Sequence, residues 1–268
     1  MTSVAEAVTA VPAATPHHTV SELLAVVSCR YLLGKRRVFA GIGLPTLAVA
    51  LAQKSTSPDI EQIYESGVCG AHPPKLPETI ADASLATGAE TILTMPVLFG
   101  YVLQGGWIDV GFLGAAQIDR FGSLNTSVIG PWDSPTVRLP GSGGAAEVMA
   151  NSQEVFVVMR RHNRTSFVRE LDFCTSPSPA AARRVDPKVP TRGAGVTTVI
   201  SELGVFKSDA AGELCLASIH EGVTVEQIRD QTGWPVKVLD GLTVTRPPTG
   251  EELRLLRDEI DPGRVYLR

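Results

Sequence analysis

The chain has 268 residues, of which 44% are hydrophobic and 19% charged, so it can bury a proper core and is not a disordered charged polymer. With 24 basic and 28 acidic residues its formal net charge is −4, which gives no reason to expect nucleic acid or an anionic membrane as a partner. The length fits one large domain, and the 25 glycines and 19 prolines predict many turns and loops.

The cysteines and the apolar stretches bear on the expected cellular compartment. No stretch approaches the roughly 20 apolar residues of a membrane helix. Neither a disulfide scaffold nor a thiolate zinc site is expected, because no close pairing joins the four cysteines, which are Cys29, Cys69, Cys174 and Cys215. The reducing cytoplasm is therefore the expected location.

Residues 1–18 are predicted to be a flexible N-terminal extension. They lack the basic start and the compact apolar segment of a signal peptide. From Thr19 the pattern becomes helical, because Thr19 and Glu22 have the spacing of a capping box and apolar residues follow at helical intervals as far as residue 33. Residues 19–268 are expected to form the single domain.

The next segments predict a strand, a glycine turn, a helix and a second strand. The strands are expected at 38–42 and 60–64, with the helix at 45–53, where Pro45 stands in the first turn. A strand, helix, strand order favours parallel pairing. The second strand would deliver Glu65-Ser66-Gly67 into a loop.

The remaining segments continue this alternation. Residues 68–108 carry no clear assignment, and 176–192 are expected to be a surface excursion rich in proline. Strands are expected at 110–115, 126–129, 155–159, 196–201, 204–206 and 214–218, a hairpin turn at 208–212, and helices at 225–231 and 251–261. The fold class is therefore α/β, with an open, mostly parallel sheet flanked by helices.

Glycine clusters at 41–43, 105–106 and 141–145 could bring backbone N–H groups close to a ligand. Taken singly, each cluster is more typical of a tight turn. The first also departs from the dinucleotide-binding fingerprint, because Leu44-Pro45-Thr46 follows where a third glycine is needed.

A hydrolytic triad of Ser142, His162 and Asp172 fits poorly, because the loop around Ser142 lacks the GxSxG nucleophile elbow. His162 lies in the basic run Arg160-Arg161-His162-Asn163-Arg164, so we expect a surface or phosphate-facing histidine. No metal site is expected, since His72 has no second ligand at a suitable spacing.

Glu65 follows a predicted strand, at the carboxyl edge of a parallel sheet where α/β proteins bind ligands. A carboxylate there can act as a nucleophile. On the pattern alone, an ordinary solvated or ion-paired glutamate is favoured.

Several short segments form a specific pattern when they occur together and in this order, although none of them is specific alone. They are 41–45 (Gly-Ile-Gly-Leu-Pro), 65–67 (Glu-Ser-Gly), 114–119 (Gly-Ala-Ala-Gln-Ile-Asp), 124–125 (Leu-Asn), 141–145 (Gly-Ser-Gly-Gly-Ala), 175–177 (Thr-Ser-Pro) and 259–263 (Glu-Ile-Asp-Pro-Gly). With them the chain, from about Thr19 to its end, resembles the B (catalytic) subunit of class I CoA-transferases, of the glutaconate CoA-transferase type. The resemblance implies the fold of that family.

The resemblance also implies a mechanism. In this family the glutamate that corresponds to Glu65 attacks an acyl-CoA thioester, and a covalent glutamyl-CoA intermediate then passes CoA to a second carboxylic acid. The glycine-rich loop supplies N–H donors for the developing oxyanions, which assigns oxyanion or CoA-binding roles to Gly143, Gly144 and Ala145.

The family further implies that the partner is a separate A subunit, with coenzyme A and acyl-CoA as substrates and no permanently bound cofactor. Two alternatives stay open: an acyl-CoA hydrolase or decarboxylase on the same fold, and a non-catalytic CoA-binding subunit. Retention of Glu65 favours transfer, because relatives with those other reactions have lost or replaced this glutamate.

Overall fold

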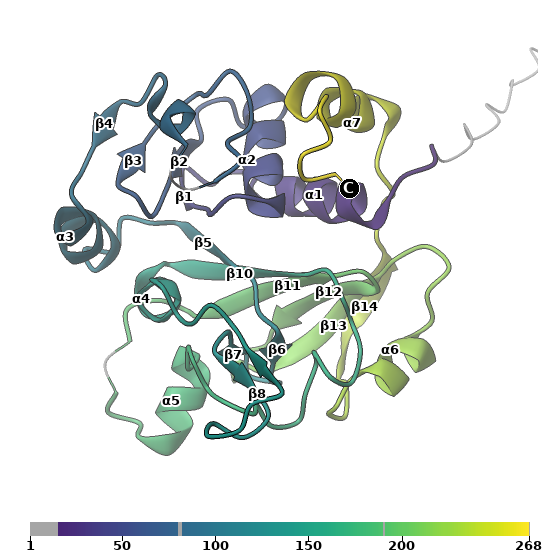
Figure 1. The fold of residues 1–268 in the computed structure, drawn as a ribbon. Helices are drawn as coiled ribbons and strands as arrows, with labels where there is room; N and C mark the ends of the chain where they lie inside the picture. Colours follow the sequence, from purple (N-terminus) through teal and green to yellow (C-terminus); the bar gives the residue numbers. More distant parts are fainter. Residues whose placement is uncertain (1–15, 80–81, 190, 268) are drawn as a thin grey trace, which may run out of the picture.

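A computed structural model describes residues 16–79, 82–189 and 191–267. The predicted extension at 1–18 therefore lies almost wholly outside the described residues. Figure 1 shows one large twisted sheet with helices on both faces. Within the described residues this sheet has ten strands, in the order β14-β13-β12-β11-β10-β5-β1-β2-β3-β4.

Parallel pairing dominates the centre of the sheet, where β2, β1, β5, β10 and β11 lie side by side. Antiparallel pairs extend it through β3 and β4 on one side and through β12 and β13 on the other. The strands of the large sheet are β1 (Arg37–Phe39), β2 (Glu61–Ile63), β3 (Val68–Cys69), β4 (Thr91–Ile92), β5 (Val110–Leu113), β10 (Glu154–Met159), β11 (Val196–Ser201), β12 (Gly204–Ser208), β13 (Leu214–Ile219) and β14 (Val238–Val244).

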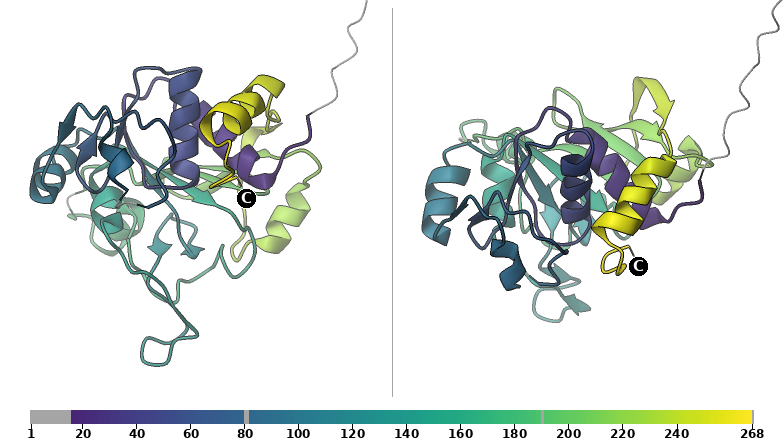
Figure 2. Two further views of the ribbon diagram at one scale, coloured as in Figure 1. Left: turned by 45° about the horizontal axis from the view of Figure 1, so that its top comes forward. Right: turned by 90° about the horizontal axis from the view of Figure 1, so that it is seen from above.

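Helices cover both faces of the sheet, as the views in Figures 1 and 2 show. On one face lie α1 (Val20–Tyr31), α2 (Leu44–Lys54), and α7 (Gly250–Arg254) with its continuation η3 (Leu255–Ile260). On the other face lie α4 (Ala145–Asn151), α5 (Pro179–Val185), α6 (Val225–Gln231) and two small sheets, β6 (Gln117–Ile118) with β7 (Leu124–Asn125) and β8 (Val128–Ile129) with β9 (Val137–Arg138). The short helices η1 (Ala83–Ala86), α3 (Met95–Val97) and η2 (Leu98–Leu103) belong to the β3 to β5 connection.

Alternating side chains of the central strands build a core on each face. From β10, Phe156 and Val158 join the cluster under α1 and α2, whereas Val155 and Val157 join the cluster on the opposite face. Because both faces are covered, these strands are continuously apolar, and the sequence identifies them readily.

The predicted capping box begins α1. The Thr19 side chain accepts a hydrogen bond from the Glu22 amide, and the Glu22 carboxylate accepts one from the Thr19 amide. Glu22 is also paired with Arg257 of η3 over 2.6 Å. Burial alone would raise the pKa of Glu22, but the hydrogen bonds from Arg257 and Thr19 outweigh it and hold the pKa below its usual value. The first helix is thereby fastened to the C-terminal segment.

The predicted α/β class and the parallel pairing of β1 with β2 are confirmed. Three details differ. Residues 126–129 do not form a strand of the main sheet, since only Val128–Ile129 is a strand and it pairs with β9. The excursion at 176–192 contains α5, and the helix expected at 251–261 widens into the π-helical turn η3. In the described part of the chain, no helix is long and apolar enough to cross a membrane.

Candidate active site

Glu65 lies in a tight turn between β2 and β3. The Gly67 amide donates to the Tyr64 carbonyl over 2.9 Å, and Tyr64 in turn pairs with Val68, so Glu65 and Ser66 occupy the tip. Gly67 adopts a φ of +97°, and a Cβ there would lie 1.9 Å from the Leu93 carbonyl oxygen. This position therefore needs glycine, which accounts for the third residue of the Glu-Ser-Gly motif.

The glycine-rich loop is far from this turn in the sequence but lies next to it in the structure. Gly144 caps the start of α4, and its amide donates to Glu65 Oε1 over 2.9 Å across 79 residues of chain. The structure thus brings together two segments that the sequence analysis singled out separately.

The three residues predicted as oxyanion or CoA-binding positions have different surroundings. A Cβ on Gly143, whose φ is +46°, would lie 3.4 Å from Glu65 Oε1, so the backbone there passes close to the carboxylate. The Ala145 amide donates to the Ser142 carbonyl over 2.8 Å. Of the three N–H groups, Gly144 is the one directed at Glu65.

Phe99 limits what can stand at position 144. A Cβ on Gly144 would lie 2.6 Å from Phe99 Cζ, which is too close unless the ring shifts, and 3.1 Å from Glu65 Oε1, which is a tight contact. The Phe99 ring packs edge-on against Phe39 at 6.1 Å between centroids. The aromatic pair and the glycine together fix the distance between the loop and the carboxylate. Phe99 lies in the segment 68–108, to which the sequence assigned no clear structure. The apolar residues around Phe99 were the signal that could have pointed to its packing role.

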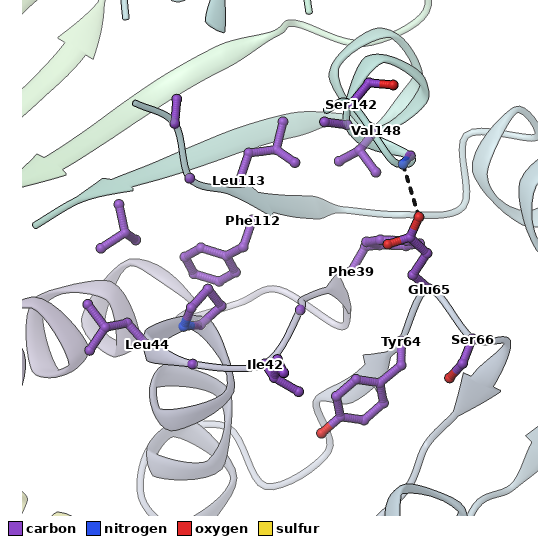
Figure 3. Close-up of a pocket in the computed structure, with 18 of the residues that line it drawn as sticks. Phe39, Ile42, Leu44, Tyr64, Glu65, Ser66, Phe112, Leu113, Ser142 and Val148 are labelled. Carbon is purple, nitrogen blue, oxygen red and sulfur yellow. Dashed lines mark hydrogen bonds between the residues drawn. The ribbon is translucent and has the colours of Figure 1, made fainter. Parts of the chain in front are cut away.

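A cavity of about 510 Å³ extends from Glu65 along the carboxyl ends of the central strands. Figure 3 shows Glu65 reaching from one wall toward the loop of α4, with Phe39 beside it and Phe112 and Leu113 farther along the cavity. Arg160, at the end of β10, also lines the cavity. The space is mostly apolar, with the Glu65 carboxylate in one wall, while the Arg160 guanidinium donates to Ser21 Oγ over 2.7 Å and to the Tyr266 carbonyl over 3.4 Å.

The triad that the sequence disfavoured does not assemble. His162 Nδ1 lies 2.8 Å from Ser201 Oγ and Nε2 lies 3.0 Å from Thr232 Oγ1, so both ring nitrogens are used elsewhere. Ser142 lines the cavity, but its hydroxyl points away from Glu65 (Figure 3).

The expectation of a surface or phosphate-facing His162 is wrong. The side chain is only 3% exposed and stacks on Phe167 with ring centroids 3.6 Å apart. Burial lowers its pKa to about 3, so it is a neutral core residue at physiological pH. The neighbouring arginines led to the wrong prediction, because they are exposed whereas the side chain of His162 turns inward.

Nothing in the described part of the chain groups three or more His, Cys, Asp or Glu side chains around a possible metal position. All four cysteines are free thiols. The candidate site is therefore built from Glu65, the Gly143-Gly144 backbone and an apolar cavity.

Comparison with known proteins gives a consistent result. The family model described as Coenzyme A transferase matches residues 34–231. The chain is 42% identical over 241 residues to the B subunit of the 3-oxoadipate CoA-transferase of Pseudomonas knackmussii, covering 90% of this chain and 92% of that protein.

The crystal structure of glutaconate coenzyme A-transferase from Acidaminococcus fermentans matches with a TM-score of 0.85 at 25% identity, covering 95% of this chain and 99% of that one. A relative with another reaction also matches. The cholesterol ring-cleaving hydrolase IpdB subunit of Rhodococcus jostii is 32% identical over 240 residues, covering 84% of this chain and 88% of that protein.

Proposed function

The chain belongs to the coenzyme A transferase family, and on that premise we propose that it is the B subunit of an enzyme that moves CoA from an acyl-CoA to a carboxylic acid. The observation that carries the proposal is the hydrogen bond from the Gly144 amide to Glu65 Oε1 at the mouth of an apolar cavity. A carboxylate nucleophile beside a backbone donor is what acyl transfer through a covalent intermediate requires.

In the proposed reaction Glu65 Oε2 attacks the thioester carbon of the acyl-CoA. The carbon–sulfur bond breaks, CoA leaves as a thiolate, and a mixed anhydride forms. The thiolate then attacks the Glu65 carboxyl carbon, and the bridging oxygen departs with the first acid. Glu65 is left as a CoA thioester whose carbonyl oxygen is Oε1. The second acid reverses these steps and leaves as the new acyl-CoA.

This sequence gives the Gly144 amide a defined task. Attack on the Glu65 carboxyl carbon places the developing negative charge on Oε1, the atom to which the amide already donates. Gly144 therefore serves the two steps at the Glu65 carbon. In the steps at the substrate's own acyl carbon the charge develops on the substrate oxygen, and there we assign the donor role to Gly143. Ala145 contributes to the cavity wall.

A separate A subunit is part of the proposal, because the relative from Pseudomonas is itself one named subunit of a CoA-transferase. No permanently bound cofactor is needed, since the glutamate supplies the nucleophile and CoA enters as substrate. Four free cysteines without close partners favour the cytoplasm as the compartment.

The proposed acids are short dicarboxylates. The names of two matching proteins contain 3-oxoadipate and glutaconate, both dicarboxylic. In this chain the cavity is lined mostly by apolar side chains, which suits the short carbon chain of such an acid.

Hydrolysis is the second candidate, because the IpdB relative is a hydrolase subunit. Steady-state kinetics of the chain with its cognate A subunit separate the two. Transfer predicts ping-pong behaviour, no release of free CoA without an acceptor acid, and loss of activity in Glu65→Gln. Steady release of CoA from acyl-CoA alone, at the same rate as with acceptor, would instead identify a hydrolase.

A further inference from the structure

Four arginine side chains line one cavity of about 830 Å³ on the face of the sheet that α6 covers. They come from the segments after β6 and β10 and from α6, and they are Arg120, Arg164, Arg169 and Arg229. Residues 232–236, which read Thr-Gly-Trp-Pro-Val, complete the lining. We name these residues the arginine basin. The reaction proposed for Glu65 does not use them.

The positive charge of the arginine basin is largely unbalanced. Arg229 Nη1 lies 4.0 Å from the exposed carboxylate of Glu226. In the part of the chain that the structure describes, the other three guanidinium groups form no ion pair, and no acidic side chain lines the basin. The chain as a whole is acidic, with a formal net charge of −4. Four like charges repel one another, so a bound anion would relieve a repulsion that the chain itself does not balance.

The backbone on one side of the basin is fixed by close packing. The Gly233 amide donates to the Phe167 carbonyl over 2.7 Å. A Cβ on Gly233 would lie 2.7 Å from both the Phe167 carbonyl oxygen and the Arg169 amide nitrogen, so this position needs glycine. The loop 232–236 therefore packs directly against the segment that carries Arg169.

The arginine side chains differ in how they are held. Arg164 Nε donates to the Asp230 carbonyl over 2.6 Å, which orients the guanidinium and leaves its terminal NH₂ groups for a ligand. The Arg120 guanidinium lies 4.6 Å over the Phe121 ring. Arg169 is exposed, and its side chain makes no hydrogen bond or ion pair with any residue that the structure describes. Donors are thus directed or free on more than one side of the basin.

The arginine basin is separate from the candidate active site. Trp234, which is 3% exposed, belongs to the buried cluster on the α6 face, whereas Phe112 of the Glu65 cavity belongs to the cluster under α1 and α2. Figure 1 shows α6 on the opposite face from these two helices. The Arg120 carbonyl accepts a hydrogen bond from Leu214 of β13, and β13 is six positions from β2 in the sheet, or about 29 Å.

The lining indicates the kind of ligand. Planar guanidinium groups bind phosphate oxygens in pairs, and several of them in one basin suit an anion with more than one phosphate group. Trp234 and Val236 are buried, so among the described residues no large exposed apolar side chain is offered as an anchor for a protein partner. The basic run at 160–164 contributes Arg164 to the basin, whereas His162 is buried.

We propose that the arginine basin binds a small anion that carries at least two phosphate groups, such as a nucleoside diphosphate, and that this ligand is distinct from the substrate CoA. The inference does not depend on the proposed function, because the basin and the Glu65 cavity share no lining residue. It assigns a second binding site to the chain.

Equilibrium dialysis of the full chain assembled with its cognate A subunit, with radiolabelled pyrophosphate as the probe, measures this binding. We expect saturable binding that unlabelled ADP displaces. Arg164→Gln and Arg169→Gln should each weaken it at least about 10-fold, since each removes charge-assisted hydrogen bonds. The Arg169 variant removes no hydrogen bond or ion pair within the described residues, so the fold should be kept.

Arg161→Gln is the matched control. This arginine is exposed and belongs to the same basic run, but it does not line the basin, so the variant should bind pyrophosphate like the wild type. Equal weakening by Arg161→Gln would show general attraction to positive charge and overturn the proposal. The absence of saturable pyrophosphate binding by the wild type would overturn it as well.

Two further measurements separate the basin from the candidate active site. Pyrophosphate affinity should be unchanged in Glu65→Gln and in the presence of saturating CoA. Displacement of pyrophosphate by CoA, or loss of its binding in Glu65→Gln, would place the phosphate in the substrate's own site and contradict a second site.

Discussion

Glu65 carries two carboxylate oxygens with different surroundings. Gly144 N–H donates to Oε1 over 2.9 Å, whereas no hydrogen bond to Oε2 is found among the residues that the structure describes. In the proposed reaction the free oxygen acts as the nucleophile, and the bonded one receives the charge when the Glu65 carbon is attacked. One backbone amide therefore distinguishes the two oxygens.

Gly144→Ala tests this arrangement. The new methyl group would meet Phe99 Cζ at 2.6 Å and Glu65 Oε1 at 3.1 Å, so the loop or these side chains must shift, which disturbs the hydrogen bond from the amide to Oε1. We expect kcat for CoA transfer to fall about 10²-fold, the usual effect of losing one oxyanion donor.

The second variant Phe99→Ala makes the result specific. In the double variant Gly144→Ala/Phe99→Ala the aromatic clash is gone, so part of the lost kcat should return. Purely additive losses in this double-mutant cycle would mean that Phe99 does not set the position of the loop.

His162 predicts a pH dependence of stability. Burial lowers its pKa to about 3, from an ordinary value of 6.5. Between these values the unfolded chain binds a proton that the folded chain does not, so stability is fully present above pH 6.5 and is lost as the pH falls toward 3. At pH 5 this residue therefore lowers the free energy of unfolding by about 2 kcal/mol, compared with its value above pH 6.5.

Urea unfolding of wild type and His162→Gln at pH 7 and pH 5 measures that contribution. The wild type should lose about 2 kcal/mol more than the variant between the two pH values. His220, whose pKa burial also lowers, is retained in both proteins and cancels in the comparison. Equal losses would show that His162 is protonated in the folded state.

Glu65 and His162 show what the sequence could and could not predict for single residues. The Glu-Ser-Gly motif placed Glu65 at a strand end, because local turn chemistry is encoded in adjacent residues. The burial of His162 depends on Phe167, Ser201 and Thr232, which meet it only through tertiary packing. No local pattern around position 162 carries that information.

At the scale of elements, Gly111 of β5 lets α4 lie close to the sheet. A Cβ at this position would lie 2.4 Å from Val148 Cγ1 and 2.7 Å from Ser152 Oγ. Because α4 begins at Gly144, the distance between this helix and β5 also sets the distance between the donor and Glu65.

Gly111→Ala should therefore lower both stability and activity. We expect a loss of about 1–3 kcal/mol in the free energy of unfolding, from overpacking against Val148, and a lower kcat as α4 moves. Gly250→Ala is the matched control, because nothing lies within 4 Å of its added Cβ and it stands in a helix. An unchanged kcat in Gly111→Ala would show that the position of α4 does not affect the candidate site.

The elements that the sequence identified share a strong periodic or apolar signal, as β10 and α1 do. Those it left unassigned are short or atypical. α4 and α5 have only seven residues each, and β14 is interrupted by Gly241 and largely exposed. Their conformation is decided by the surfaces they pack on, which a single-sequence pattern does not contain.

At the scale of the whole molecule, the sheet order explains how one site arises from distant segments. Glu65 follows β2, Arg160 follows β10, and β1 and β5 lie between these strands. With neighbouring strands about 4.8 Å apart, the two strand ends are separated by about 14 Å. That span leaves space for a short acid along the cavity, consistent with the short acids proposed above.

The central claim, that Glu65 carries CoA covalently, is tested most directly by mass spectrometry of the chain assembled with its A subunit. Incubation with acyl-CoA and no acceptor should add CoA, less one water, to the peptide that contains Glu65, and acceptor acid should remove it. Glu65→Gln should not form this adduct. Turnover at the wild-type rate by Glu65→Ala, or CoA transfer without any adduct on this peptide, would contradict the account.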